Sequence, residues 1–202
     1  MTIDGYRTPR ATCLLAPNPS PMTLDGTNTW VIAEPGSPSV VVVDPGPEDE
    51  EHLRRVLAAA VAGDRRVSAI LLTHGHLDHS AGAARLAELS GAPVQAADPA
   101  RRLGAEGFAD GDVITAAGCE LRVVATPGHS GDSVSLLLPA DGALFTGDTV
   151  LGRGTRRVGL GHLVAAGRGP RGRSGRRDHP ATAHGRDAGR ARGVRGCGRH
   201  PG

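Results

Sequence analysis

The sequence has few cysteines, no long apolar run and no leader-like segment, and each of these shortages excludes a class of protein. Its three cysteines, Cys13, Cys119 and Cys197, are odd in number and far apart, which argues against a disulfide framework and a thiolate metal site. No apolar run approaches the ~20 residues that cross a bilayer. Residues 1–10 mix polar, charged and glycine residues, unlike a signal peptide. We therefore expect a cytoplasmic protein that does not enter a membrane.

Large apolar and aromatic side chains are also missing from the C-terminal part of the chain. Residues 156–202 contain no Phe, Tyr or Trp, whereas 12 of these 47 residues are Gly and 12 are Arg. Such a segment cannot bury enough apolar surface to offset the entropy lost on ordering. We expect one domain in residues 1–155, long enough for a substantial core, and a disordered or out-of-frame Arg/Gly-rich tail in residues 156–202.

The charge of the chain divides at the same place. Residues 1–155 hold 11 arginines and 19 carboxylates, for a net charge of 11 − 19 = −8, and residues 156–202 hold 12 arginines and 2 aspartates, for 12 − 2 = +10. Such a split is typical of an acidic domain with a basic arm. The acidic first part disfavours a nuclease, which would need a basic groove beside its metals, so nucleic acid is not the favoured partner.

Short apolar runs and helical periodicity alternate in the first 155 residues. The runs are rich in branched residues and predict buried strands at Trp30–Ala33, Val40–Val43, Val67–Leu72, Leu121–Val124, Val134–Leu138 and Ala143–Phe145. Apolar residues at helical spacing predict one helix at Glu48–Val61, with an acidic first turn, and another from about Ala81 to Leu89 that stops at Gly91. Sheets with helices outside them make a layered α/β architecture.

The motif Thr73-His74-Gly75-His76-Leu77-Asp78-His79 carries the strongest chemical signal, directly after a predicted strand. Imidazole and carboxylate groups are ligands that zinc accepts readily. Two residues apart on an extended segment, His74 and His76 point the same way and can hold one ion. Asp78 and His79 follow as the chain turns into the next helix and can reach a second ion. The alternative, a polar turn that happens to hold three histidines, does not explain four ligand-type residues in six positions.

Two further ligand-type residues stand where predicted strands end. His129 follows Pro127-Gly128, and Asp148 follows Thr146-Gly147. Alone, a histidine after Pro-Gly is usually a loop residue, and an aspartate after a strand is usually a cap. Because a metal site at the edge of a sandwich is built from ligands that converge from several strand ends, we include both residues in the candidate site.

Residues from about Pro17 to Thr155 resemble the metallo-β-lactamase superfamily in these motifs and in two others. Asn18–Thr29 resembles the opening segment of the subgroup that contains β-lactamase-like protein 2 and related glyoxalase II-like hydrolases. Asp44-Pro45-Gly46 resembles the superfamily's strand-ending Asp-x-Gly. The resemblance implies an α/β fold of the αββα four-layer sandwich type, with a dinuclear metal site at one edge.

The resemblance also implies a role for each candidate ligand. One zinc ion would be held by three histidines, namely His74, His76 and His129. The second zinc ion would be held by Asp78 and His79, and Asp148 would bridge the two ions. Asp44 would orient the ligands from behind, although a simple turn residue before Pro45-Gly46 explains Asp44 equally well.

Two adjacent cations would give such a site hydrolytic chemistry. A water molecule that bridges them loses a proton near neutral pH, and the ions polarise the scissile carbonyl or phosphoryl group. Asp78, at the edge of the site, is the candidate catalytic residue because it could orient or deprotonate the attacking water. The expected function is a zinc-dependent hydrolase that uses a metal-bridging hydroxide on a small-molecule ester, thioester or phosphodiester.

The C-terminal part departs from the family pattern. The family supplies one more ligand, a histidine in a Pro-Gly-His-Gly context, and then a helix that completes the outer layer; both are missing here. The expected sandwich is therefore incomplete at the C-terminus, and the second zinc site lacks its usual last histidine. A frameshift is one explanation: His179–His184 could be encoded by CAC CCG GCC ACG GCC CAC, and this string reads Pro-Gly-His-Gly-Pro in another frame.

Two other functions stay open from the sequence. One is a catalytically impaired or inactive chain with an incomplete metal site. The other is a polyanion-binding protein that uses the basic tail, although this tail lacks the aromatic residues that stack on bases. Metal-dependent turnover would separate the hydrolase from both. The sequence leaves the oligomeric state open.

Overall fold

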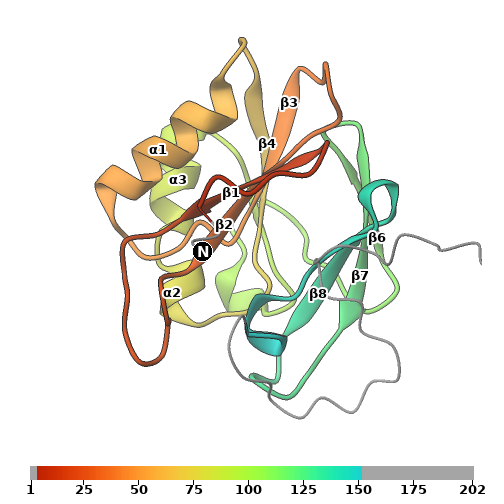
Figure 1. Cartoon of the computed structure of the whole chain (residues 1–202). Helices are drawn as coiled ribbons and strands as arrows, with labels where there is room; N and C mark the ends of the chain where they lie inside the picture. Colours follow the sequence, from red (N-terminus) through yellow and green to blue (C-terminus); the bar gives the residue numbers. More distant parts are fainter. Residues whose placement is uncertain (1–3, 152–202) are drawn as a thin grey trace, which may run out of the picture. The chain divides into compact units, whose positions relative to one another are not determined.

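The computed structural model describes residues 4–151, whose strands form two sheets (Figure 1). The five-stranded sheet has the order β1 (Ala11–Leu15), β2 (Asn28–Ile32), β3 (Ser39–Val43), β4 (Arg66–Leu71) and β5 (Val94–Gln95). The four-stranded sheet has the order β6 (Val113–Ala116), β7 (Cys119–Ala125), β8 (Val134–Leu138) and β9 (Ala143–Phe145). Neighbours are antiparallel except in the β3-β4-β5 part of the first sheet, which is parallel.

Helices cover one face of the first sheet, and the second sheet covers the other face (Figure 1). The helix α1 (Glu50–Val61) packs on β3 and β4, and α3 (Ala83–Ser90) packs on β4 and β5. The short helix α2 (Leu77–Ser80) lies between them in the chain, and single 3₁₀ turns form η1 (Pro99–Arg101), η2 (Pro139–Asp141) and η3 (Gly147–Thr149). Residues 4–151 thus build three layers of the expected sandwich.

The outer helix of the family pattern would follow the last candidate ligand, and that stretch of the chain lies beyond the described residues. Within residues 4–151, no helix covers the outer face of the second sheet. The predicted incompleteness of the sandwich and the predicted tail at residues 156–202 lie outside the described residues. No helix in the described part of the chain has both the length and the apolarity that a membrane span requires.

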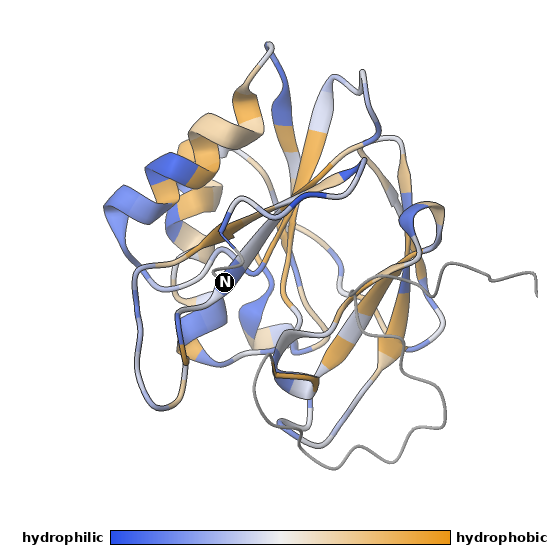
Figure 2. Ribbon diagram, viewed as in Figure 1, coloured by the Kyte–Doolittle hydropathy of each residue, from blue (hydrophilic) through white to orange (hydrophobic). Residues whose placement is uncertain are grey.

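The core lies between the layers, which explains the two apolar patterns in the sequence. Val40–Val43 of β3 are all buried, because helices cover one side of this strand and the second sheet covers the other. The strand β7 alternates instead, with Leu121 and Val123 buried and Glu120 and Arg122 exposed. Figure 2 shows the same contrast, with apolar residues along the inner strands and hydrophilic residues toward the outside of the helices.

Local signals decide where the helices begin and end. The helix α1 begins at Glu50, two residues later than predicted, because Asp49 caps it by accepting a hydrogen bond from the backbone N–H of His52 at 2.7 Å. The helix α3 ends as predicted before Gly91, which has a φ of 72°. The prediction of one helix from Ala81 to Leu89 was wrong at its start, because Leu77–Ser80 already form a separate helical turn.

One buried histidine makes the stability of the fold sensitive to pH. His52 is fully buried, and its Nε2 lies 2.9 Å from Oγ1 of Thr29, while its Nδ1 has no hydrogen-bond partner in the described part of the chain. Burial lowers the pKa of His52 from 6.5 to about 4, with help from the nearby Arg55. The unfolded chain therefore takes up a proton near pH 6.5 that the folded chain accepts only near pH 4.

We expect the free energy of unfolding of His52→Gln to fall less than that of the unchanged chain as the pH is lowered. The contribution of neutral His52 is fully present above pH 6.5 and is lost as the pH falls toward 4, which amounts to roughly 3 kcal/mol over this range. Urea unfolding of both chains between pH 7.5 and about 4.5 measures the difference in slope. Equal slopes for the two chains would mean that His52 is not held neutral by the fold.

Candidate metal centre

The candidate ligands come from both sheets and meet at one end of the sandwich. His74 and His76 lie on the segment after β4, and Asp78 and His79 lie on α2. The second sheet contributes two residues, His129 from the loop between β7 and β8 and Asp148 from η3 after β9. The backbone N–H of Val134 in β8 donates to the carbonyl of Thr73 at 2.8 Å, which fixes this part of the second sheet beside the segment that carries His74.

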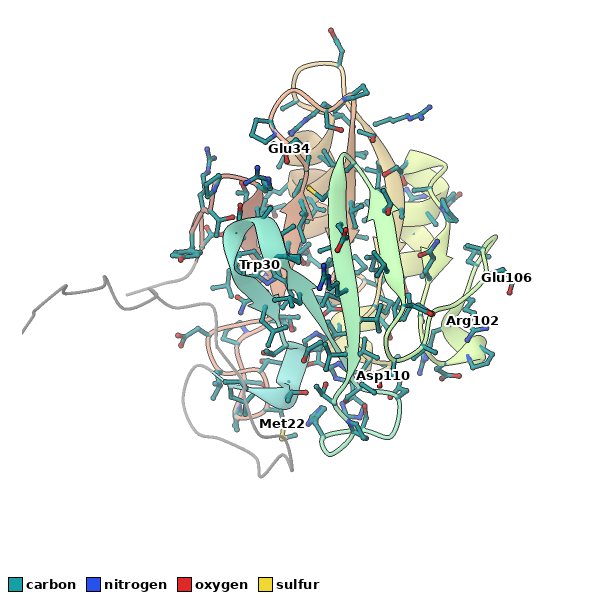
Figure 3. The ribbon with its side chains drawn as sticks, turned by 90° about the vertical axis from the view of Figure 1, so that its right-hand side faces the viewer. Met22, Trp30, Glu34, Arg102, Glu106 and Asp110 are labelled. Atoms are coloured by element: carbon teal, nitrogen blue, oxygen red, sulfur yellow. The ribbon has the colours of Figure 1, made fainter. Side chains whose placement is uncertain are left out.

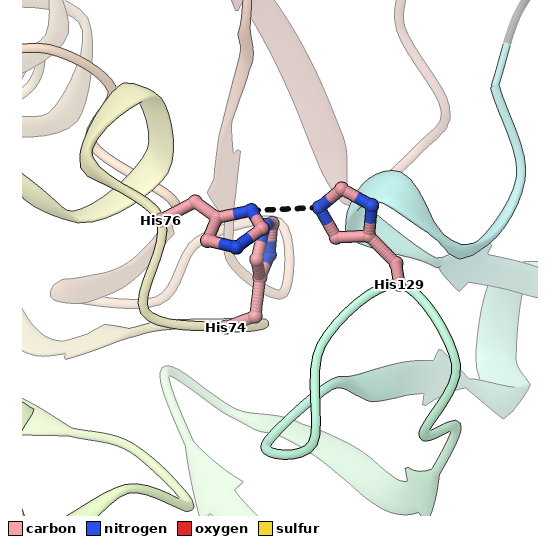
Figure 4. Close-up of side chains that lie close together, drawn as sticks. All are labelled: His74, His76 and His129. Atoms are coloured by element: carbon pink, nitrogen blue, oxygen red, sulfur yellow. Dashed lines mark hydrogen bonds between the residues drawn. The ribbon is translucent and has the colours of Figure 1, made fainter.

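One group of three histidines lies close enough to share an ion. The side-chain nitrogens of His74, His76 and His129 lie within 4.8 Å of one another (Figure 4). Nδ1 of His76 and Nε2 of His129 face each other at 2.7 Å. Nε2 of His74 is buried and has no hydrogen-bond partner among residues 4–151. A buried nitrogen without a partner is costly, and a metal ion in this group would satisfy it.

A second group consists of His74, His79 and Asp148, whose ligand atoms also lie within 4.8 Å of one another. His74 cannot hold two ions with one nitrogen, so a second ion would have His79 and Asp148 from this group. The two oxygens of Asp148 face different histidines: Oδ1 lies 3.2 Å from Nε2 of His79, and Oδ2 lies 3.4 Å from Nε2 of His129. Asp148 therefore belongs to the second group and also faces the first group through His129.

Asp78 stands next to the second group without belonging to it. Its Oδ2 lies 3.6 Å from Nε2 of His79, and its side chain is 30% exposed. The sequence interpretation had Asp78 and His79 turning away before a helix at Ala81, but both lie within α2. The structure therefore brings all six candidate ligands to one place, with Asp78 at the solvent-facing side.

Asp44 holds the centre in position from beneath. Its buried carboxylate accepts hydrogen bonds from the backbone N–H of Thr73 at 2.8 Å, from Oγ1 of Thr73 at 2.7 Å and from Nδ1 of His79 at 2.9 Å. The second ring nitrogen of His79 is thereby turned toward Asp148. Of the two interpretations of Asp44, the geometry supports orientation of the ligands, although the residue also has the turn-like φ of 51°.

Thr73 and Gly147 are supporting residues that the sequence interpretation did not single out. Oγ1 of Thr73 lies 3.1 Å from Nδ1 of His74, in addition to its bond to Asp44. A Cβ on Gly147 would lie 2.3 Å from the same oxygen. Gly75, in the same motif as Thr73, lies close to other side chains: a Cβ there would be 3.1 Å from Nε of Arg101 and 3.2 Å from Oδ2 of Asp132.

Charge in the centre separates the histidines. Burial, together with the neighbouring His79, lowers the pKa of His74 to about 4, so His74 is neutral and ready to ligate. Burial would also lower the pKa of His79, but the carboxylates of Asp44 and Asp148 outweigh it and raise this pKa to about 10. Burial opposes ionisation of Asp148, yet its hydrogen bond to His79 leaves its pKa below the ordinary value. Metal binding would therefore release the proton of His79.

Gly147→Ala is expected to destabilise the chain more than a matched glycine substitution. Gly147 and Gly142 have φ values of 49° and 58°, so alanine at either position costs about 1–2 kcal/mol of backbone strain. Only at Gly147 would the new Cβ also clash with Thr73, at a further cost of about 1–3 kcal/mol, because Gly142 has open space around it. Urea midpoints of the two variants test this; equal midpoints would rule out the clash.

Comparison with known proteins agrees with this geometry. The sequence profile of the Metallo-beta-lactamase superfamily matches residues 22–191. The chain belongs to this superfamily. The structure of this metallo-β-lactamase-superfamily chain is similar to that of ETHE1 from Myxococcus xanthus, with a TM-score of 0.59 and 29% identity over 73% of this chain and 60% of the other. A family protein from Thermus thermophilus shares the fold, with a TM-score of 0.60, 23% identity and coverage of 76% and 64%.

Curated relatives include proteins of fungi and animals. The chain is 39% identical over 158 residues to a protein of Aspergillus fumigatus named atrochrysone carboxyl ACP thioesterase, covering 74% of this chain and 48% of the relative. It is 32% identical over 151 residues to the beta-lactamase-like protein 2 homolog of Caenorhabditis elegans, covering 71% and 51%. The expected likeness to β-lactamase-like protein 2 is thus confirmed. The chain spans about half the length of the curated relatives it matches.

Proposed function

We propose that this chain is a zinc-dependent hydrolase that acts on a small-molecule ester, thioester or phosphodiester. The observation that carries the proposal is the position of Asp148, whose two carboxylate oxygens face His79 on one side and His129 on the other. A carboxylate whose two oxygens face different histidines is placed to ligate each of two adjacent metal ions. The name of the thioesterase relative supports a thioester among these substrates.

The ligand set fits zinc. One ion would be held by three histidines, namely His74, His76 and His129. The second ion would be held by His79 and Asp78, and Asp148 would be a ligand of both ions. The donors are imidazole nitrogens and carboxylate oxygens, which zinc accepts, and the buried Nε2 of His74 needs a partner. Bound zinc would supply an activated water near neutral pH and a Lewis acid for the scissile group. The second ion has fewer ligands than the first among residues 4–151, so we expect it to bind more weakly.

The residues of the chain divide the remaining work. Asp44 fixes the ring of His79 through Nδ1, which leaves Nε2 toward the site. Thr73 connects Asp44 to His74, so the two histidines share one rigid support. Asp78 is exposed enough to meet substrate and lies 3.6 Å from His79, where it would orient the attacking water or accept its proton. The free buried thiols of Cys13 and Cys119 agree with a cytoplasmic location.

Metal analysis together with turnover tests the proposal. Purified full-length chain, dialysed against zinc, should retain at least one zinc ion per chain by elemental analysis and should hydrolyse a methyl ester, a thioester or dimethyl phosphate only when zinc is present. Retention of zinc without turnover of any of these would favour the catalytically impaired chain. Absence of bound zinc would contradict the ligand assignment itself.

A further inference from the structure

A cavity of about 620 Å³ opens directly beside the candidate metal centre. Asp78, His79 and Asp148 form part of its wall, so a molecule in the cavity would lie against the second group of ligands. The loop between β1 and β2 forms one side, and the segment from Leu144 to Leu151 forms the other. A volume in this range accommodates a small organic group.

The walls away from the metal ligands combine a group of large apolar side chains with the polar side chains of Thr23, Asn28 and Thr146. The apolar side chains come from strands of both sheets, from the loop between β1 and β2 and from the segment after η3, namely Leu15, Met22, Leu24, Trp30, Leu144, Phe145, Val150 and Leu151. The ring centroid of Trp30 lies 5.0 Å from that of Phe145 and 6.3 Å from that of Tyr6. These two edge-on contacts fix the position of the Trp30 ring. Figure 3 shows Trp30 and Met22 beside the last described segment of the chain, drawn in cyan. Met22 is 72% exposed, so the fold does not need its side chain.

The charge of the cavity restricts what it can bind. The charged residues that line it in the described part of the chain are aspartates, without any arginine: Asp25, Asp44, Asp78 and Asp148. Asp44 is occupied by its bonds to Thr73 and His79. A phosphodiester carries its negative charge next to the scissile bond and is normally bound by arginine or lysine. Among residues 4–151 the cavity thus offers an anion no cationic side chain, although zinc bound at Asp78 and Asp148 would offset part of the negative charge.

The loop between β1 and β2 is built to hold its shape. The side chain of Asn18 accepts from the backbone N–H of Thr27 at 2.9 Å and donates to Oγ1 of Thr27 at 3.1 Å, which closes the loop at its base. Gly26 has a φ of 134°, and a Cβ there would lie 2.1 Å from the carbonyl of Ala16. Leu24 lines the cavity from a left-handed backbone with a φ of 58°. An apolar residue with a strained backbone conformation, on a loop that hydrogen bonds hold in place beside a reactive centre, is a feature of preformed binding sites.

We propose, on the basis of the hydrolase function above, that this cavity binds the apolar acyl group of an ester or thioester. The scissile carbonyl would lie at Asp148 and the acyl chain between Met22, Leu24 and Trp30. Water adds its oxygen to the carbonyl carbon, the bond from this carbon to the alcohol oxygen or thiol sulfur breaks, and the leaving group takes up a proton. The products are a carboxylic acid and an alcohol or thiol, with no oxidant or reductant involved.

Trp30 allows the cavity to be tested without turnover, because it is the one tryptophan in the sequence. We expect N-methylcyclohexanecarboxamide, an amide analogue of the acyl group, to change the tryptophan fluorescence of the full chain saturably. N-methylacetamide and dimethyl phosphate should bind at least about 10-fold more weakly, since they leave the apolar walls uncovered. Equal binding of all three probes, or stronger binding of dimethyl phosphate, would overturn the proposal.

Two variants of exposed residues, one in the cavity and one outside it, separate a loss of binding in the cavity from a general effect of a new surface charge. Met22→Asp should weaken binding of the cyclohexyl probe about 10-fold or more. Leu103→Asp, which changes a 50% exposed leucine outside this cavity, should leave binding unchanged. In the zinc-loaded chain, the kcat/KM ratio for the S-methyl thioesters of cyclohexanecarboxylic and acetic acid should fall with Met22→Asp only. Saturable binding without hydrolysis would support the cavity and contradict the hydrolase; hydrolysis without acyl preference or probe binding would do the reverse.

Discussion

His76→Ala should remove zinc binding and hydrolysis together while leaving the fold intact. His76 is exposed and contributes its Nδ1 to the three-histidine group, so its loss opens the first site without creating a buried cavity. The zinc affinity should fall by more than the roughly 10–100-fold that residues behind the ligands typically contribute. Competition with a chromophoric chelator measures this affinity, and thermal unfolding in the presence of chelator checks the fold.

The matched control for His76 is its neighbour Leu77, which is 65% exposed. Leu77→Ala changes the same turn of chain without removing a ligand atom, so zinc affinity and turnover should stay within about 2-fold of the unchanged chain, the scatter expected of surface substitutions. A His76→Ala chain that holds zinc as tightly as Leu77→Ala would show that the histidine group has been wrongly assigned.

Asp44→Ala should be the most destabilising single substitution in the centre, even in the absence of metal. It deprives the N–H and Oγ1 of Thr73 and the Nδ1 of His79 of their common acceptor, all in a buried position. Removing one partner of such a buried charged network costs about 3–5 kcal/mol. Urea unfolding with excess chelator measures the loss without a contribution from bound zinc.

Asp44→Asn separates charge from shape. Asparagine has the same size and tolerates the φ of 51°, but its amide nitrogen cannot accept the hydrogen bonds that one carboxylate oxygen now receives. We expect it to lose less stability than Asp44→Ala and still to lose zinc affinity, because His79 would no longer be held for ligation. A metal-free Asp44→Ala chain as stable as the unchanged chain would show that Asp44 is only a turn residue.

The sequence predicted the buried part of the fold well and its periphery poorly. Val134–Leu138 and Ala143–Phe145 match β8 and β9 in their bounds, because each is a short, mostly apolar run whose residues are almost all buried. The strand β1 mixes Thr12 and Cys13 with apolar residues, β5 has only two residues, and Val113 of β6 is 52% exposed. None of these edge strands has a clear period, so pairing with neighbours rather than local pattern forms them.

The positions of the ligands could also be predicted from the sequence, because their signal is local. Dense ligand-type residues at strand ends indicate a site whatever the details of the fold, and all six residues lie together. The supporting contacts were not accessible, because they join residues far apart in the chain. Only the folded arrangement brings the methylene of Gly147 against Thr73, or the carboxylate of Asp44 against both Thr73 and His79.

The division of the ligands between the two sheets has a mechanical consequence. His74, His76 and His79 follow β4 of the first sheet, and His129 and Asp148 follow strands of the second. Within residues 4–151, the backbone bond from Val134 to Thr73 connects the two parts near this end. Bound ions, ligated from both parts of the sandwich, would hold the two sheets together at this end. Each tenfold rise in free zinc above the dissociation constant would add about 1.4 kcal/mol to the free energy of unfolding. Zinc supply would then set how long the folded molecule survives as well as how fast it works.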